Sequence, residues 1–295
     1  MLEFKPITPA DFGELKKCFS SAPVGFCDRT PGTAVLWRNV YSNCRCFFDD
    51  TIIVRSVFAG KTEFLYPVGK NPCGAIEEII THCKSEGTEC MIYSATDEEA
   101  AALLEKYPES TSVTSRDWSD YIYDKNAILS LSGRKYATQR NHINKFRSLY
   151  PEFSFERITE KDIPELIEFT ENFTFPSQKS GNNAAAELGV CIDTLKNFSS
   201  LGLFGAVLKI GEKIIGYSIG EILGDMLYVH IEKADTTYQG SYQMVTNLFL
   251  KEFAADDSIK FVNREDDCGD EGLRRSKLSY HPVSLPAKNC ITVRV

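Results

Sequence analysis

The 295-residue sequence has little histidine, only one close pair of cysteines (Cys44 and Cys46) and no long hydrophobic run. Its four histidines and ten cysteines show none of the spacings that zinc sites need, and no CxxC pair occurs, so no metal site is expected. The longest nearly apolar run, residues 201–210, is far too short to cross a bilayer. These absences argue against a zinc-stabilised domain and against a membrane-spanning protein.

Positive charge is also scarce, with 33 Lys and Arg residues against 41 Asp and Glu residues and a net charge of −8. This balance argues against a surface that is basic all over and binds nucleic acid non-specifically, but it is compatible with a local basic patch. Hydrophobic residues make up 43% of the chain, which predicts a globular protein with a substantial core. No signal peptide is recognisable, so the cysteines are expected to be reduced thiols in a cytoplasmic protein.

The two halves of the chain repeat one pattern at a constant offset of 151 residues. In the first half Thr8 is an expected helix N-cap with Asp11 in the first turn, and in the second half Thr159 and Asp162 form an expected capping-box pair. Further matching pairs are Phe4 and Phe155, Ile7 and Ile158, Glu14 and Glu165, Leu15 and Leu166, and the turn glycines Gly60 and Gly211. An offset of about half the chain length predicts two copies of one domain.

Hydrophobic periodicity and turn signals predict alternating strands and helices in both halves. In the first half, strands are predicted at residues 51–58, 62–66, 89–94 and 117–123, and helices at 72–85 and 97–107. In the second half, strands are predicted at 203–209, 213–221, 226–233, 259–262 and 291–295, and helices at 184–198, 239–254 and 269–277. A strand meander followed by βαβ crossovers is the plan of GNAT-type acyltransferases. The expected fold is therefore α/β, with two tandem GNAT-like domains at residues 1–150 and 151–295, each a mixed sheet flanked by helices.

A basic helix at about residues 133–148 is expected to end the first domain. Between residues 125 and 150 there are six Lys or Arg residues and no Asp or Glu. The candidates for phosphate contact are Arg134, Lys135, Arg140, Lys145 and Arg147. Clustered cations of this kind bind RNA backbones by releasing counterions, and the alternative is a solvated helix between the domains.

The predicted strand at 226–233 alternates polar and apolar residues, with one set expected on each face of the sheet. The polar set is Tyr228, His230 and Glu232, and the apolar set is Leu227, Val229 and Ile231. The polar face is a candidate lining for a cleft in which an amine is deprotonated, although a single histidine on a strand is also typical of hydrogen-bonded structure.

A polar turn, Gln239-Gly240-Ser241-Tyr242, follows this strand and leads into the next predicted helix. Free backbone N–H groups at a helix N-terminus suit a phosphate or pyrophosphate, so these four residues are candidates for donor binding. Because only one glycine is present, an ordinary strand-to-helix turn is the alternative.

The segment 262–282 combines a polar strand end, a glycine-containing acidic turn and a short basic helix. It is expected to form a wall of the substrate cleft. Glu265, with His230 and Glu232, is a candidate for moving the proton, and Tyr280 is a candidate acid. The candidates for substrate contact are Tyr228, Asn263, Arg264, Asp266, Arg274 and Lys277. A cation site at 265–271 is less favoured because the spacing does not match an EF-hand loop.

Three segments, at 120–146, 228–254 and 261–283, resemble the phosphatidylglycerol lysyltransferase C-terminal-domain family, and the resemblance extends over nearly the whole chain. It implies a tandem GNAT-like protein similar in plan to the peptidoglycan-bridge aminoacyltransferases. Its best-understood relatives transfer an amino acid from aminoacyl-tRNA to a lipid or cell-wall amine or hydroxyl. Because the sequence lacks a membrane-spanning flippase region, it is similar to the stand-alone bacterial members of unassigned role.

Three functions follow from these patterns. The first is an aminoacyltransferase that uses aminoacyl-tRNA as donor and a small-molecule, lipid or peptide acceptor, with at most a peripheral contact to a membrane. The second is an N-acetyltransferase that uses acetyl-coenzyme A, and the third is a non-catalytic GNAT-like protein that binds a ligand or partner. In the first two cases the donor is a substrate, so no tightly bound cofactor is expected.

Overall fold

The computed structural model describes residues 2–21, 25–174 and 182–295, which fold into two compact units. One unit consists of Met1–Asp120 with Leu285–Val295, and the other of Tyr121–Ser284. The expected division at residue 150 therefore differs from the observed one. The reason is an exchange of strands between the halves of the chain: β8 (Ile122–Asp124) pairs with β13 (Phe261–Asn263), whereas β14 (Asn289–Val293) pairs with strands of the first unit.

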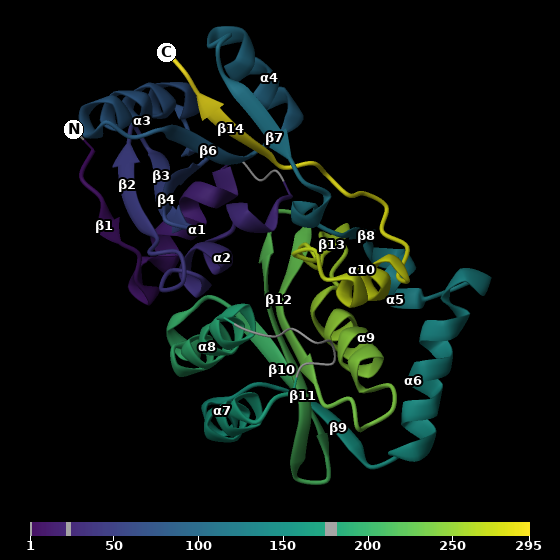
Figure 1. Cartoon of the computed structure of the whole chain (residues 1–295). Helices are drawn as coiled ribbons and strands as arrows, with labels where there is room; N and C mark the ends of the chain where they lie inside the picture. The colour runs from purple at the N-terminus through teal and green to yellow at the C-terminus, as the bar shows by residue number, and fades with distance from the viewer. Residues whose placement is uncertain (1, 22–24, 175–181) are drawn as a thin grey trace. The chain divides into compact units, whose positions relative to one another are not determined.

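The first unit is built on an eight-stranded sheet in the order β1-β2-β3-β4-β6-β14-β7, with β5 paired to β3 (Figure 1). Helices α3 and α4 contribute to a core of buried aliphatic and aromatic side chains on this sheet. The remaining strands are β1 (Lys5–Pro6), β2 (Cys44–Phe48), β3 (Thr51–Phe58), β4 (Lys61–Leu65), β5 (Val68–Gly69), β6 (Cys90–Ala95) and β7 (Thr111–Thr114). The helices are α1 (Phe12–Ser21), α2 (Pro31–Leu36), α3 (Pro72–Glu86) and α4 (Asp97–Lys106).

The second unit is built on a six-stranded sheet in the order β8-β13-β12-β11-β10-β9. Helices α7 and α8 lie on one face of this sheet and α9 lies on the other, with α6 packed beside α9 (Figure 1). The remaining strands are β9 (Phe153–Arg157), β10 (Phe204–Ile210), β11 (Lys213–Leu223) and β12 (Met226–Ala234). The helices are α5 (Lys125–Ser130), α6 (Ala137–Leu149), α7 (Ile163–Glu171), α8 (Asn182–Lys196), α9 (Ser241–Phe253) and α10 (Glu271–Leu278).

Both units follow the GNAT-like plan that the sequence predicts. Each unit begins its sheet with four antiparallel strands, β1–β4 in the first unit and β9–β12 in the second. A helix then crosses over to a strand that pairs in parallel with the fourth one, which is β6 beside β4 and β13 beside β12. The crossover helices are α3 and α9. The chain is therefore a tandem GNAT-like α/β protein.

The two capping pairs confirm the internal repeat. Thr8 and Asp11 form a capping box, and so do Thr159 and Asp162 at the same offset. In each case the aspartate also binds a cation on the equivalent second strand of the sheet. The Asp11–Arg45 distance is 2.5 Å and the Asp162–Lys209 distance is 2.7 Å. The repeat therefore includes a strand-to-helix ion pair that the sequence comparison did not identify.

The predicted match between Gly60 and Gly211 is wrong. Gly60 lies in the β3–β4 turn and Gly211 in the β10–β11 turn, which are not equivalent positions in the two sheets. The topological counterpart of Gly60 is Gly224, between β11 and β12, and all three glycines have positive φ. Turn glycines recur wherever a tight turn needs positive φ, so an equal spacing between two of them carries little information.

A β-bulge interrupts the pairing of β11 with β12. Ile219 pairs with Ile231 and Gly220 with Val229, so His230 is the additional residue. Before the bulge Val229 faces the α9 core, whereas after it Glu232 faces α9 and accepts a hydrogen bond from Thr246. The predicted common face for Tyr228, His230 and Glu232 is therefore wrong, because the bulge reverses the alternation between His230 and Glu232.

Gly220 is needed where the bulge brings two backbones together. A Cβ atom at this position would lie 2.2 Å from the Tyr228 carbonyl oxygen, whereas Gly189 in α8 has no atom within 4 Å of its Cβ position. We expect Gly220→Ala to destabilise the protein by about 1–3 kcal/mol through strain. Gly189→Ala should instead stabilise α8 by about 0.5–1 kcal/mol. Urea unfolding followed by circular dichroism measures both, and equal midpoints for the two variants would contradict the prediction.

Candidate functional site

His230 lies at the bulge between two glutamates of the second unit. Its Nδ1 atom is 2.8 Å from Oε1 of Glu265, and its Nε2 atom is 2.9 Å from Oε1 of Glu221. The His230 side chain is 1% exposed and that of Glu221 is fully buried, whereas that of Glu265 is 23% exposed. The three side chains form a buried row that ends in one accessible carboxylate.

The two glutamates determine the charge of His230. Burial lowers the pKa of this imidazole, but hydrogen bonds and charge interactions with Glu221 and Glu265 more than offset it and raise the pKa to about 10. At neutral pH both ring nitrogens therefore carry protons and donate to the carboxylates. An imidazolium has no free lone pair, so His230 cannot itself accept a proton, and its hydrogen bond holds the Glu265 carboxylate in place.

A strained backbone presents Glu265. Its φ is 57°, which is uncommon for a residue other than glycine, and its backbone N–H donates to the Asn263 side-chain oxygen at 2.7 Å. The ammonium of Lys277 donates to the carbonyl oxygens of Arg264 and Asp266 on either side of it. Burial raises the pKa of Glu265, and the contact with His230 opposes that shift. Asn263 and Lys277, predicted to contact substrate, therefore shape the backbone around Glu265.

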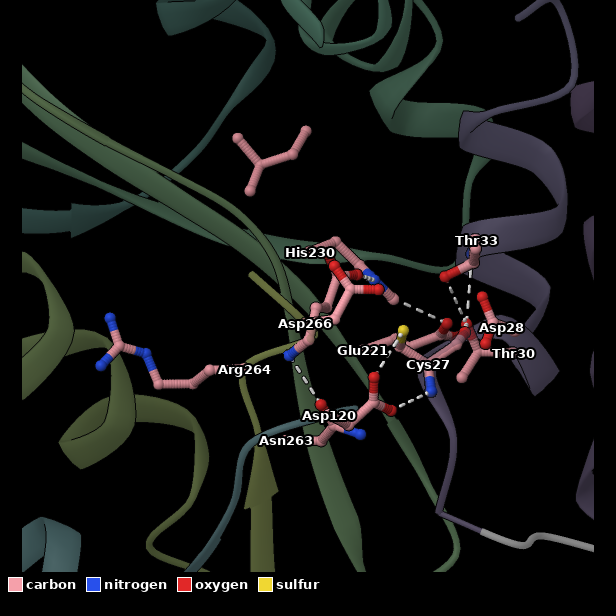
Figure 2. A network of polar contacts seen from close by, with 12 residues as sticks. Cys27, Asp28, Thr30, Thr33, Asp120, Glu221, His230, Asn263, Arg264 and Asp266 are labelled. Atoms are coloured by element: carbon pink, nitrogen blue, oxygen red, sulfur yellow. Dashed lines mark hydrogen bonds and ion pairs between the residues drawn. The ribbon is translucent and has the colours of Figure 1, made fainter. Parts of the chain in front are cut away.

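Arg264 and Glu232 form a second network on the α9 face of the sheet. Arg264 Nη2 lies 2.8 Å from Glu232 Oε1, and the guanidinium stands over the Tyr280 ring at 4.9 Å. Figure 2 shows the Arg264 side chain directed away from His230. Burial raises the pKa of Tyr280 to about 12. The structure thus separates Glu232, Arg264 and Tyr280 from the Glu221–His230–Glu265 row.

The acidic turn after Asp266 is organised by Asp267, which the sequence did not single out. Its carboxylate accepts hydrogen bonds from Arg274 at 2.9 and 2.7 Å, from the Tyr121 hydroxyl at 2.5 Å and from the Gly269 N–H at 2.9 Å. Burial opposes ionisation of Asp267, but these bonds lower its pKa to about 2. Arg274, a predicted substrate contact, is therefore engaged in holding the turn.

The sequence analysis identified neither Glu221 nor Asp267 as a site residue. For Glu221 the sequence contains only one weak indication. Glu221 stands in β11 opposite Tyr228, in a strand that is otherwise nearly all apolar or glycine. A glutamate in a buried strand predicts a charge partner, and this was the one signal available. The ring of Tyr228 stacks near His230, with centroids 6.3 Å apart. Tyr228, which lies in β12 like His230, thus places an aromatic ring beside the row.

The predicted donor loop lies at the carboxyl end of β12. Gly240 has φ 87°, and a Cβ atom there would lie 2.5 Å from the His142 carbonyl oxygen of α6. The Ser241 hydroxyl donates to the Asp235 carbonyl oxygen at 2.7 Å, and the Gln239 N–H donates to the Tyr150 hydroxyl at 3.4 Å. Tyr242 follows in the first turn of α9 and is largely buried, which raises its pKa. The loop therefore packs closely against α6.

The basic residues before and within α6 belong to the second unit. Arg134, Lys135, Lys145 and Arg147 are exposed, and Arg140 is half-buried and donates to the Gly133 carbonyl oxygen at 2.7 Å. Within the described ranges, none of these five cations forms an ion pair. Four uncompensated, exposed cations on one short stretch form a positive surface in an otherwise acidic protein.

Among the helices of the described residues, none has both the length and the apolar character required to span a membrane.

The charge state of His230 has a measurable consequence for stability. Because its pKa is raised from 6.5 to about 10 in the folded protein, the imidazolium contributes fully below pH 6.5 and loses that contribution as pH rises through about 10. We expect the stability advantage of the wild type over His230→Gln to decrease steadily across this range. Urea unfolding at a series of pH values measures it, and an advantage independent of pH would indicate a neutral histidine.

Comparison with known proteins places the chain in a family. A conserved protein of unknown function from Bacteroides thetaiotaomicron VPI-5482 is 29% identical, with a TM-score of 0.91 and complete coverage of both chains. The C-terminal domain of a putative lysylphosphatidylglycerol synthetase from Agrobacterium fabrum is 14% identical, with a TM-score of 0.67 over 97% of this chain and 93% of that one.

An uncharacterised protein of Mycoplasmoides gallisepticum is 30% identical over 177 residues, which are 59% of this chain. The chain spans 56% of the length of that curated relative. The family model described as phosphatidylglycerol lysyltransferase, C-terminal, matches residues 26–290, nearly the whole sequence. The chain therefore belongs to the phosphatidylglycerol lysyltransferase C-terminal-domain family.

Proposed function

We propose that the protein is an aminoacyltransferase that moves an amino acid from aminoacyl-tRNA to an amine or hydroxyl acceptor. The observation that carries the proposal is the row of Glu221, His230 and Glu265, which exposes one oriented carboxylate at the bulge. The family is named for an aminoacyl transfer, and the GNAT-like fold is one that brings an acyl donor and a nucleophile together.

In the proposed reaction the acceptor attacks the aminoacyl ester carbonyl directly. Glu265 accepts a proton from the attacking amine or hydroxyl, a new amide or ester bond forms, and the ester bond to the tRNA ribose breaks. Glu265 then gives this proton to the ribose oxygen, which leaves as a hydroxyl, so that the carboxylate is regenerated. His230 keeps Glu265 ionised and oriented, because its positive charge opposes the rise in pKa that burial causes.

The donor is proposed to be tRNA because of the basic stretch at α6. Its exposed cations are not neutralised by acidic neighbours among the described residues, so they are available for phosphates. An acetyl-coenzyme A donor would need an accessible phosphate site at the start of α9, where Gly240 already packs on the α6 backbone. The acceptor is proposed to be a lipid headgroup, a cell-wall precursor or a peptide.

Glu265→Gln tests the proton acceptor. We expect it to lower kcat by roughly 10²–10⁴-fold because the amide cannot accept the proton. The matched control is Glu152→Gln, which neutralises an exposed glutamate in a turn of the same unit. The assay incubates each variant with tRNAs charged with labelled amino acids and a panel of lipid, peptide and cell-wall acceptors. Transfer by Glu265→Gln at the wild-type rate would refute the assignment.

Charge reversal on α6 tests the donor. Lys145→Glu with Arg147→Glu should weaken tRNA binding and reduce the slope of log K against log salt by roughly 0.7–0.9 for each phosphate that is no longer neutralised. Lys196→Glu, at the end of α8, is the matched control because it reverses an exposed charge away from α6. Binding is measured by titration at several salt concentrations. Tight binding of coenzyme A, with tRNA binding unaffected by the α6 changes, would favour an acetyltransferase instead.

A further inference from the structure

A buried cluster in the first unit brings a thiol and an amine into contact. The Cys27 thiol lies 3.3 Å from the Lys288 ammonium, although the two residues are 261 positions apart in the sequence. Cys27 belongs to a short 3₁₀ turn, and Lys288 directly precedes β14. Both side chains are buried, with 4% of each residue exposed. The residues of the cluster belong to the first unit, and the proposed transfer does not use them.

Two aspartates hold these groups together. The Asp120 carboxylate lies 3.1 Å from the Cys27 thiol and 2.7 Å from the Lys288 ammonium, and it also accepts the Cys27 backbone N–H at 2.7 Å. Asp28 lies 2.7 Å from the same ammonium. Figure 2 shows Cys27 with Asp28 and Asp120 around it. Asp120 therefore contacts both the nucleophilic sulfur and the amine.

We propose that Cys27 and Lys288 form a reversible covalent cross-link when the protein meets hydrogen peroxide. The Cys27 thiol donates to the Asp120 carboxylate, which takes the thiol proton as the sulfur attacks the peroxide and passes it to the leaving hydroxide. The Lys288 ammonium beside the sulfur stabilises the thiolate formed in that step. A sulfenic acid formed in a buried site is protected from most thiols, and it condenses with a nitrogen nucleophile that is already in contact. In this cluster that nitrogen is Lys288 Nζ.

The reaction balances in two steps. First, the thiol reacts with one hydrogen peroxide, so that sulfur is oxidised to a sulfenic acid and the peroxide is reduced to water. Second, the Lys288 ammonium gives one proton to Asp120, and its nitrogen displaces the sulfenic hydroxyl as water to form an Sγ–Nζ bond. The second step is a condensation that needs no further oxidant. A thiol reductant breaks the bond and restores both side chains.

The cross-link would join the beginning of the first unit to its last strand. Residues 285–295 belong to this unit and contain β14, which lies between β6 and β7 in the sheet. A bond at Lys288 would therefore hold β14 in place and restrict the unfolded chain. The expected result is a first unit that resists unfolding more strongly after oxidation.

Peptide mass spectrometry of the full-length protein tests the proposal. After peroxide treatment we expect the peptide with Cys27 to be joined to the peptide with Lys288, with a mass two hydrogens below their sum, and dithiothreitol should separate them. Cys290→Ser is the matched control, because this half-buried cysteine lies in β14 but outside the cluster, and the variant should cross-link like the wild type.

Lys288→Arg keeps the positive charge but removes the reactive amine. In this variant a sulfenic acid at Cys27 should persist and be trapped by dimedone, whereas the wild type should give little trapped product. If Lys288→Arg does not fold, Cys27→Ser tests the same proposal, because this variant should yield no linked peptide. Oxidation of wild-type Cys27 to a sulfinic acid or a mixed disulfide without the linked peptide would overturn the proposal, and so would an unreactive Cys27.

Discussion

One additional residue in β12 determines how the second unit arranges its charges. With continuous pairing, Tyr228, His230 and Glu232 would share a face, and three polar side chains would crowd one surface of the sheet. The bulge at His230 instead directs Glu232 toward Thr246 of α9 and leaves His230 between Glu221 and Glu265. Two separate networks result, one buried under α9 and one reaching the solvent through Glu265. A bulge re-aims side chains in this way at many functional sites.

The charged residues of the buried row, Glu221, His230 and Glu265, depend on one another for charge compensation. Glu221 is fully buried, and a buried carboxylate without a cationic partner would be strongly destabilising. The His230 imidazolium offsets that cost and also lies beside Glu265, whose carboxylate is partly exposed to solvent. The raised pKa of His230 and the opposing influences on Glu265 are two aspects of one interaction. The same pair of hydrogen bonds from His230 therefore both positions Glu265 and stabilises the fold.

Caps and turn residues in the sequence predicted many helices and strands correctly, but the sequence did not predict which strands pair with one another. The predicted strand at 51–58 and the helix beginning at Pro72 match β3 and α3, because turn residues and caps mark their ends. The predicted strand at 117–123 begins in the 3₁₀ turn Arg116–Trp118, continues without regular structure and reaches a strand only at the short β8. β8 and β14 each pair in the opposite unit to the one expected. Pairing partners and the bulge depend on contacts between distant residues, which alternation along one strand does not encode.

The two units share a topology but not a site. In the first unit the pairing of β3 with β4, the counterpart of β11 with β12, runs without a register shift from Arg55–Phe64 to Phe58–Lys61. Without an additional residue in that pairing, polar and apolar side chains keep their faces, and no histidine enters the sheet there. The two units thus have equivalent strand orders, and the one-residue shift of register between β11 and β12 distinguishes the unit that holds the charged row. The proposed transfer chemistry accordingly belongs to residues 121–284, and the first unit is the one in which the Cys27–Lys288 contact ties the end of the chain to the sheet.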